Sequence, residues 1–365
     1  MSNARNLANL LGTGTQITTA DIADGAFEAN KNLIINGAMQ VAQRGTSQTG
    51  VTSSGYASAP DRFSSLINGL GTWTLSQSSD APDGFSSSYK WECTVADSSI
   101  SAGDYGILLQ RMEGQNLQHL KKGSSNAESL TASFWVKSSK TGTYIFELYE
   151  NHSQRSISKS YTISSANTWE YKSITIPGDT VGTINNDNTE SLIPAFWVAA
   201  GSNYSSGTLQ TSWGSIVNAN RAVGVVNLAD TVGNTWQVTG VQLELGDTAT
   251  PFEHRSFGEE LSLCQRYFFR NLATFFGIPP ATSTTQISSA IQYPVEMRAN
   301  PTFSASGTPK ADPYVGSSIT ASSLTIAFFN TSKLTAALQF SNFSGLSNND
   351  PYNVQDTTVS LDAEL

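Results

Sequence analysis

The sequence predicts a mainly β protein built around a sandwich or jelly roll, and three observations support this fold class. Short segments of alternating apolar and polar residues recur between Asn32 and Phe252, and this period of two is typical of half-buried strands. Turns rich in Gly, Ser, Thr and Asn separate the segments, and no long helical pattern interrupts them. Charged residues make up 13% of the 365 residues, against about 25% in a typical globular chain, so we expect a neutral polar surface.

Residues 1–31 are predicted to form a short N-terminal helical segment that attaches the chain to something else. Its apolar residues form two groups at helical spacing, separated by a Gly-Thr-Gly stop. Isolated helices shorter than ~12–15 residues are marginal in water, so sister chains or a larger assembly must cover both apolar faces. The residues that we assign to attachment and oligomerisation are Leu7, Leu10, Leu11, Ile22 and Ala26.

Residues 32–252 are predicted to form the jelly-roll β-sandwich. Leu130–Val136 and Tyr144–Leu148 each alternate cleanly between apolar and polar residues. In Trp236–Leu245 the alternation slips at Gly240, which predicts a β-bulge at that glycine.

Residues 253–265 are predicted to form a helical hinge, and residues 266–365 a smaller C-terminal β-domain that is the distal tip. Ser256 and Glu259 have the spacing of a capping box. The alternation from Val359 to Leu365 is typical of a strand. Prolines crowd the first half of this domain, and we expect them in loops or at sheet edges; they are Pro279, Pro280, Pro294, Pro301, Pro309 and Pro313.

The charge and the hydropathy pattern exclude several partners. The net charge is −9, which argues against nucleic-acid binding because that function needs a basic patch. No apolar run approaches the ~20 residues of a membrane span, so we expect no membrane insertion. The start resembles no signal peptide, so we expect the chain to be made in a reducing cytosol. Lys121 and Lys122 are expected to be solvated, and Cys93 and Cys264 to be small buried residues without a disulfide.

The acidic and histidine residues do not predict an enzyme. Glycoside hydrolysis needs two carboxyl groups that face each other across a sugar. Glu147 and Glu150 should point to opposite faces of one strand, and Glu259 with Glu260 should stabilise the first turn of a helix. The three histidines lack the spacing of metal ligands. We expect no catalytic residue, no metal and no cofactor.

Three segments carry a first resemblance, and two of them bracket the sandwich. Asn32–Gly37, Ser133–Lys137 and Val241–Leu243 are similar, in order and spacing, to segments of the jelly-roll carbohydrate-binding modules of bacterial glycanases. The resemblance implies the jelly-roll fold. Members that bind calcium carry acidic residues where this chain has Ala38–Gln40 and Thr239–Gly240, so the calcium site is not expected here.

A second resemblance covers the whole chain. It connects the chain to the tail-fibre and appendage proteins of bacterial viruses, and the segments that carry it are Thr18–Gly25, Asn36–Thr46, Val241–Arg255, Cys264–Tyr267 and Tyr293–Thr302. The resemblance implies a virion appendage, usually a homotrimer, that recognises a host surface. Its N-terminal segment would bind other tail or head proteins of the virion.

These observations together predict a bacteriophage tail fibre that binds host-surface polysaccharide or lipopolysaccharide without cleaving it. Sugars are held by aromatic faces and by neutral amides and hydroxyls. Most aromatic residues should be core, including Trp135 and Trp197 in strand centres. The expected contact loops of the C-terminal domain contain Tyr314, Phe343, Asn348, Asn349, Asp350 and Tyr352. One alternative is a head-decoration or adaptor fibre that binds no glycan, and another is a capsular polysaccharide depolymerase.

Overall fold

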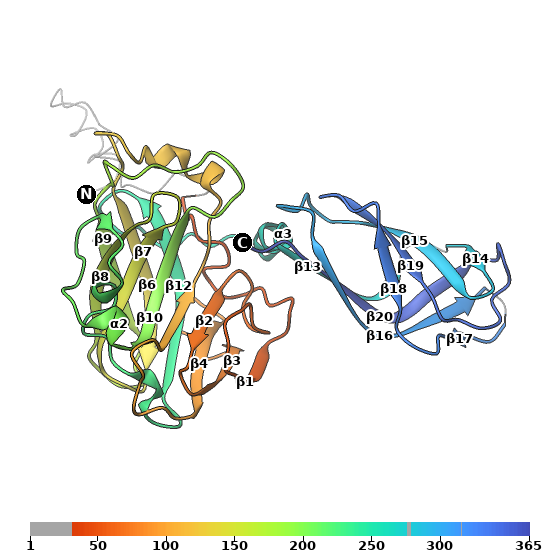
Figure 1. Ribbon diagram of the computed structural model, residues 1–365, viewed down its shortest axis with the longest axis horizontal. Helices are drawn as coiled ribbons and strands as arrows, with labels where there is room; N and C mark the ends of the chain where they lie inside the picture. Colours follow the sequence, from red (N-terminus) through yellow and green to blue (C-terminus); the bar gives the residue numbers. More distant parts are fainter. Residues whose placement is uncertain (1–30, 276–278, 315) are drawn as a thin grey trace, which may run out of the picture.

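The computed structural model describes residues 31–275, 279–314 and 316–365. The predicted N-terminal helices, with Leu7, Leu10, Leu11, Ile22 and Ala26, lie outside the described residues. Figure 1 shows two β lobes of unequal size that meet near helix α3 (Phe257–Gln265).

The larger lobe is a sandwich of two antiparallel six-stranded sheets, which confirms the mainly β prediction. The first sheet has the order β1 (Ser47–Val51), β3 (Thr72–Ser78), β4 (Ser88–Val95), β12 (Thr235–Leu245), β6 (Leu130–Ser138), β9 (Glu170–Ile176). The second has the order β11 (Gly214–Ser215), β8 (Arg155–Ile163), β7 (Gly142–Glu150), β10 (Leu192–Ala200), β5 (Tyr105–Leu109), β2 (Ser64–Asn68).

The predicted alternation places one side of each strand in an aromatic core between the sheets. Ala132, Phe134 and Val136 of β6 are buried. The Phe134 ring meets Phe196 of the opposite sheet edge-on, with ring centroids 5.0 Å apart, a favoured geometry for aromatic pairs. Because strand side chains alternate, Trp135 and Trp197 therefore point to the outer faces of the two sheets.

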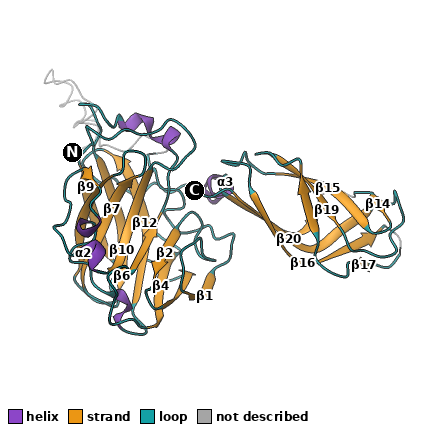
Figure 2. Ribbon diagram, in the orientation of Figure 1, coloured by secondary structure: helices purple, strands orange, loops and turns teal. Residues whose placement is uncertain are grey.

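Helix is confined to short turns around the strands, as Figure 2 shows. In the larger lobe these turns are η1 (Gly114–Leu120), α2 (Ser202–Ser205), η2 (Asn218–Asn220) and η3 (Leu228–Asp230).

The bulge predicted at Gly240 is present in β12. The pairing of β12 with β6 shifts register between Thr239 and Gln242, and Gly240 has a φ of 60°. A Cβ atom there would lie 2.7 Å from Cζ of Phe85. Glycine is needed both for the left-handed backbone and for the close approach of this ring.

The N-cap predicted for Ser256 at the start of α3 is also confirmed. The Glu259 backbone N–H donates to Ser256 Oγ at 3.3 Å, which satisfies one of the free donors of the first turn. Cys264 on this helix is buried, and both Cys93 and Cys264 are free thiols as expected.

The smaller lobe contains two antiparallel four-stranded sheets. The first has the order β13 (Phe268–Phe275), β20 (Tyr352–Asp362), β16 (Thr302–Pro313), β17 (Ile319–Thr320), and the second the order β14 (Ala281–Ser283), β15 (Gln286–Gln292), β19 (Thr335–Phe340), β18 (Ile326–Phe329). Val359, Leu361 and Ala363 are buried in its core, as their alternation predicts.

The expectation for the prolines was wrong for Pro309 and Pro313. Both lie in β16, which has β20 on one side and β17 on the other. The register of β16 with β20 shifts between Gly307 and Lys310, so Pro309 occupies a bulge, where its missing N–H breaks no ladder bond. Pro313 is the last residue of the strand.

Residue Leu365 lies at the junction of the two lobes, not at the far end of the smaller one (Figure 1). Its backbone oxygen accepts a hydrogen bond from Tyr56 Oη at 3.3 Å. Arg298 Nε donates to the Ala363 oxygen at 2.8 Å. The part of the smaller lobe farthest from the junction contains β14 and β17 (Figure 1).

Candidate functional site

The two segments that bracket the sandwich in sequence are hydrogen-bonded to each other. Asn32 Nδ2 donates to the Val241 oxygen at 3.1 Å, and its Oδ1 accepts from the Leu243 N–H at 3.1 Å. A Cβ atom on Gly37 would lie 2.1 Å from the Val241 oxygen. These contacts give the two segments a structural role, because they join the start of the sandwich to β12.

Gln43, Arg44 and Arg62 lie at the junction of the lobes. Gln43 Nε2 donates to the Phe268 oxygen at 2.7 Å. The Arg44 guanidinium lies 3.6 Å from the Phe268 ring centroid and forms a 3.0 Å ion pair with Asp362. The buried Arg62 guanidinium pairs with Glu364 and lies 3.4 Å from the ring centroid of Tyr267.

A second buried ion pair connects the start of η1 to the end of α3. Arg266 donates to the buried Glu113 carboxylate at 2.7 and 2.8 Å, and Tyr267 Oη donates to it at 2.6 Å. Although burial opposes it, these hydrogen bonds lower the pKa of Glu113. The segment Cys264–Tyr267 therefore holds the two lobes together, and the sequence contained no signal for its partner Glu113.

Burial at the junction also changes the pKa of Asp61. Its carboxylate accepts the Gln43 N–H at 3.0 Å and Gln43 Nε2 at 2.7 Å. Desolvation nevertheless dominates and raises the pKa of Asp61 to about 6. The arginines at this junction pair with acids and lie over aromatic rings of the other segments. The junction therefore connects the two lobes.

The loop residues predicted for glycan contact lie together, but two of them are core. Tyr314 directly follows Pro313, the register partner of Tyr352, and its side chain is 90% exposed. Asn348, Asn349 and Asp350 are exposed as well. Phe343 and Tyr352 are each only 3% exposed and pack in the core of the smaller lobe. Their rings are not available to a ligand, which corrects the prediction for these two residues, while the role of the loops stays a prediction.

The carboxylate pairs considered for catalysis have internal partners. Glu147 is buried on the outer side of β7, where Arg221 donates to it at 2.8 and 3.0 Å. Glu150 accepts the backbone N–H groups of His152 and Ser153 at 2.8 and 2.6 Å. Glu260 accepts the Asn36 N–H. These contacts agree with the structural roles predicted for Glu147 and Glu150. Glu260 lies in the first turn of α3 as predicted, but its hydrogen bond goes to Asn36 outside the helix.

Among residues 31–275, 279–314 and 316–365, no group of three or more His, Cys, Asp or Glu side chains is arranged to hold a metal ion. In the same described ranges, no helix is long and apolar enough to cross a membrane.

The outer face of the second sheet carries aromatic residues that are covered by residues 201–226. Trp197 is fully buried there and donates its indole N–H to Glu147 at 2.9 Å. The Arg221 guanidinium lies 5.1 Å from the Trp197 ring centroid. Because the chain itself occupies this face, Trp197 is packed as predicted and does not face solvent.

The outer face of the first sheet presents an aromatic surface, which we call the platform: Trp135, Trp169 and Tyr171. Trp135 of β6 and Tyr171 of β9 are direct cross-strand partners, and their ring centroids are 5.4 Å apart. Tyr171 is 46% exposed, while Trp135 and Trp169 are half-buried. Trp135 is therefore packed against a neighbour but not enclosed, and the prediction of a core role for it was only partly right.

Polar groups surround the platform and are paired with one another. Trp169 Nε1 donates to Asp80 Oδ1 at 3.2 Å, and Gln237 Nε2 donates to Asp80 Oδ2 at 3.2 Å. Lys137 forms an ion pair with the same carboxylate and lies 5.2 Å from the Trp169 ring centroid. Although partial burial opposes it, the hydrogen bonds from Lys137 and Trp169 lower the pKa of Asp80. The rings of the platform are thus bordered by the amide of Gln237, the ammonium group of Lys137 and the carboxylate of Asp80.

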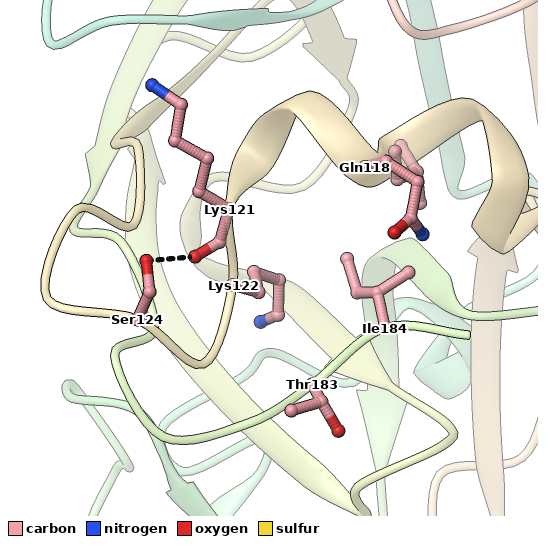
Figure 3. A pocket seen from close by; sticks show the side chains of 7 residues that line it. Gln118, Lys121, Lys122, Ser124, Thr183 and Ile184 are labelled. Carbon is pink, nitrogen blue, oxygen red and sulfur yellow. Dashed lines mark hydrogen bonds between the residues drawn. The ribbon is translucent and has the colours of Figure 1, made fainter. Parts of the chain in front are cut away.

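A separate pocket of about 320 Å³ lies between η1, the loop that follows it and the loop at Thr183–Ile184 (Figure 3). Lys122 contributes to its wall, and its side chain is only 3% exposed because it pairs with Asp179 at 3.3 Å. The expectation that Lys122 is solvated was wrong. Its partner lies 57 residues away in sequence, so no local pattern predicts the pair.

Comparisons with known proteins give only distant similarities. No protein-family model matches the chain, and no curated protein matches it in sequence. One similar solved structure is the enzymatically active domain of tailspike protein 4 of bacteriophage CBA120, with 13% identity and a TM-score of 0.32 over 59% of this chain and 22% of that chain. Another is the family 11 carbohydrate-binding module of Clostridium thermocellum in complex with a β-1,3-1,4-mixed-linked tetrasaccharide, with 13% identity and a TM-score of 0.29 over 57% of this chain and 99% of that one. At such low similarity, neither the ligand nor the activity of those proteins is transferred to this chain.

Proposed function

We propose that this chain is a non-catalytic glycan-binding appendage of a bacteriophage and that the platform stacks on a sugar of the host surface. The single observation that carries the proposal is the cross-strand pair of the half-buried Trp135 and the exposed Tyr171. Their rings lie side by side on an outer sheet face, where the C–H face of a sugar ring can pack on them.

The polar groups beside the platform fit a sugar better than a strongly charged ligand. Asp80 is matched by Lys137, so the pair presents no net charge. The amide of Gln237 and the indole N–H of Trp169 lie at the same carboxylate. A hydroxyl can both donate and accept, so a sugar can join this hydrogen-bonded group without an unpaired charge.

The proposal of a virion appendage rests on the sequence motifs. The motif residues Gln43, Arg44 and Arg266 make contacts between the two lobes, whereas the platform lies on the outer face of the first sheet. A shared arrangement that holds the lobes together would leave the platform free to differ between chains that recognise different hosts. A homotrimer would multiply weak sites, because linked sites rebind at a high effective concentration.

The test is binding of the full chain to arrays of bacterial capsular polysaccharides and lipopolysaccharides. Replacing Trp135 by Ala removes one face of the platform and should weaken binding about tenfold, the equivalent of ~1.4 kcal/mol. Tyr171→Ala should have a similar effect. Val217→Ser is a control, because Val217 is 49% exposed and belongs to the covering segment of the other sheet.

A Tyr314→Ala variant separates the platform from the loops of the smaller lobe. Loss of binding in Tyr314→Ala, with none in Trp135→Ala or Tyr171→Ala, would place the glycan site on those loops and refute the platform. If no glycan binds and a tail or head protein is captured instead, the adaptor role replaces the proposal. New reducing ends after incubation with a bound polysaccharide would show a depolymerase.

The oligomeric state is a separate test of the appendage proposal. Light scattering should give three times the 39.0 kDa mass of the chain. A stable monomer in which residues 1–31 are protected from proteolysis would contradict the trimer.

A further inference from the structure

A second aromatic cluster lies on the same outer sheet face as the platform, and we call it the triad: Phe85, Phe252 and His254. The ring centroid of Phe85 is 5.0 Å from that of Phe252 and 5.2 Å from that of His254. The centroids of Phe252 and His254 are 4.8 Å apart. Phe85 and Phe252 are half-buried and His254 is exposed, so the triad presents ring surface to solvent.

Contacts with β12 and with the platform place the triad on this face. Phe85 lies over the bulge, with its Cζ atom 2.7 Å from the position of a Cβ on Gly240. The loop that carries Phe85 also carries Asp80, which accepts the indole N–H of Trp169 in the platform. The loop before β4 therefore runs from one aromatic cluster to the other.

The platform and the triad are adjacent in one row across three strands. Tyr171 of β9 is the register partner of Trp135 of β6, and Trp135 is the register partner of Thr239 of β12. Gly240, which lies under Phe85, follows Thr239 directly. Neighbouring strands are about 4.8 Å apart, so the row from β9 to β12 spans roughly 10 Å. The other two rings of the triad extend it further, beyond the reach of a single sugar ring.

The burial of Thr239 indicates that the row is continuous. Val238 belongs to the core between the sheets, so alternation directs the side chain of Thr239 to the outer face. Thr239 is nevertheless 0% exposed, which requires other side chains of the outer face to cover it. Trp135 lies beside it across the ladder and Phe85 lies over the next residue. No open polar gap therefore separates the platform from the triad at this position.

The charges along this row favour an uncharged ligand. Lys90 of β4 pairs with Glu92 at 2.6 Å, and Lys137 of β6 pairs with Asp80. Asp83, two residues before Phe85, is an exposed carboxylate. An acidic polysaccharide would meet lysines that are already matched and an acid that repels it. An uncharged chain meets no such repulsion, and its hydroxyls can join the hydrogen bonds around Asp80.

We propose that the platform and the triad form one extended site for an uncharged polysaccharide chain, which crosses β9, β6 and β12 and stacks sugar rings on both clusters. This inference rests on the proposed function of the platform and names the class of its ligand. A terminal sugar would use the platform alone. A chain gains from the triad as well, because each stacked ring adds its own contact.

The experiment measures the affinity of the full chain, by calorimetric titration, for the uncharged surface polysaccharide that the array retains most strongly. The comparison probes are the monosaccharides, disaccharides and longer fragments obtained from it by partial hydrolysis. Affinity should rise at least about tenfold from the monosaccharides to the longer fragments, because only the longer fragments reach both clusters. Added salt should change the affinity by less than about twofold, because no contact between opposite charges is made.

Two variants assign the gain with length to the triad. His254→Ala removes an exposed ring without opening the core, and should weaken binding of the longer fragments about fivefold while leaving that of the monosaccharides within about twofold. Phe252→Ala should act in the same direction. Phe257→Ala is the matched control, because Phe257 is an aromatic residue that is 57% exposed but begins helix α3. It should leave all affinities within about twofold.

Three results would overturn the extended site. They are equal affinity for monosaccharides and longer fragments, full affinity for the longer fragments in His254→Ala and Phe252→Ala, and an array that retains acidic polysaccharides as strongly as uncharged ones or retains no uncharged one. The platform is tested separately by Trp135→Ala. Weakened glycan binding in that variant would keep the platform even if the triad plays no part, whereas unchanged binding would refute the platform itself.

Discussion

Removal of the Arg62 side chain should separate the unfolding of the two lobes. Arg62 pairs with the buried Glu364, donates from Nη2 to the Arg111 oxygen at 2.7 Å and lies over the Tyr267 ring. Loss of one partner from a buried ion pair costs about 3–5 kcal/mol, because the other charge stays buried. Arg44 still lies 3.3 Å from Glu364, so we expect the lower end, about 3 kcal/mol, for Arg62→Met.

The assay is urea unfolding followed by two signals. All seven tryptophans lie in the larger lobe, so fluorescence reports that lobe alone, whereas far-ultraviolet circular dichroism reports both. In the wild type we expect the two curves to coincide. In Arg62→Met the circular dichroism curve should begin to fall at lower urea, because the smaller lobe loses its anchor.

Lys90→Met is the control for this experiment. Lys90 pairs with Glu92, and both side chains are substantially exposed, so the loss should stay below about 1 kcal/mol. A change below about 1 kcal/mol in Arg62→Met, with coincident curves, would refute the account of Arg62 as the anchor between the lobes.

Two further predictions concern backbone geometry and pH. Gly240→Ala should destabilise the larger lobe by about 1–3 kcal/mol, since its φ of 60° and the Phe85 ring 2.7 Å from the new Cβ both oppose a side chain; an unchanged urea midpoint would contradict this. Although burial opposes it, Arg155 and Lys122 lower the pKa of Asp179 from 3.8 to about 2. The stability that Asp179 contributes is therefore present above pH 3.8 and is lost as the pH falls to 2 and below, a change of roughly 2 kcal/mol between pH 6 and pH 2. In Asp179→Asn this loss should be absent, so the difference from the wild type should shrink by that amount between pH 6 and pH 2; a constant difference would argue against it.

The sequence predicts local structure well where the cause is local. The alternation of Leu130–Val136, the slip at Gly240 and the cap of Ser256 each depend on residues a few positions apart, and each is confirmed in the structure. The wrong expectation for Pro309 has a non-local cause. A bulge depends on the partner strand β20, which lies about fifty residues further along the chain.

The candidate sites depend on contacts that the sequence does not reveal. A period of two shows that Phe134 and Trp135 face opposite ways, but not which side is covered. Phe134 is covered because the opposite sheet packs on it. Trp135 lies on the other face, beside Tyr171 of the neighbouring strand β9. Likewise Lys122 becomes buried only because Asp179 and Trp213 approach it from distant segments. Phe343 and Tyr352 follow turns, yet the fold directs their rings inward.

The contact between Asn32 and Val241 has a practical consequence for engineering. Asn32 N donates to Glu253 at 2.8 Å, and Lys31 Nζ donates to the Pro251 oxygen at 2.9 Å, so the chain enters and leaves the larger lobe at neighbouring points. Residues 31–255 can therefore be transplanted into a surface loop of a carrier protein whose two insertion points lie close together. Such a chimera would display the aromatic face alone, without the smaller lobe or the first thirty residues.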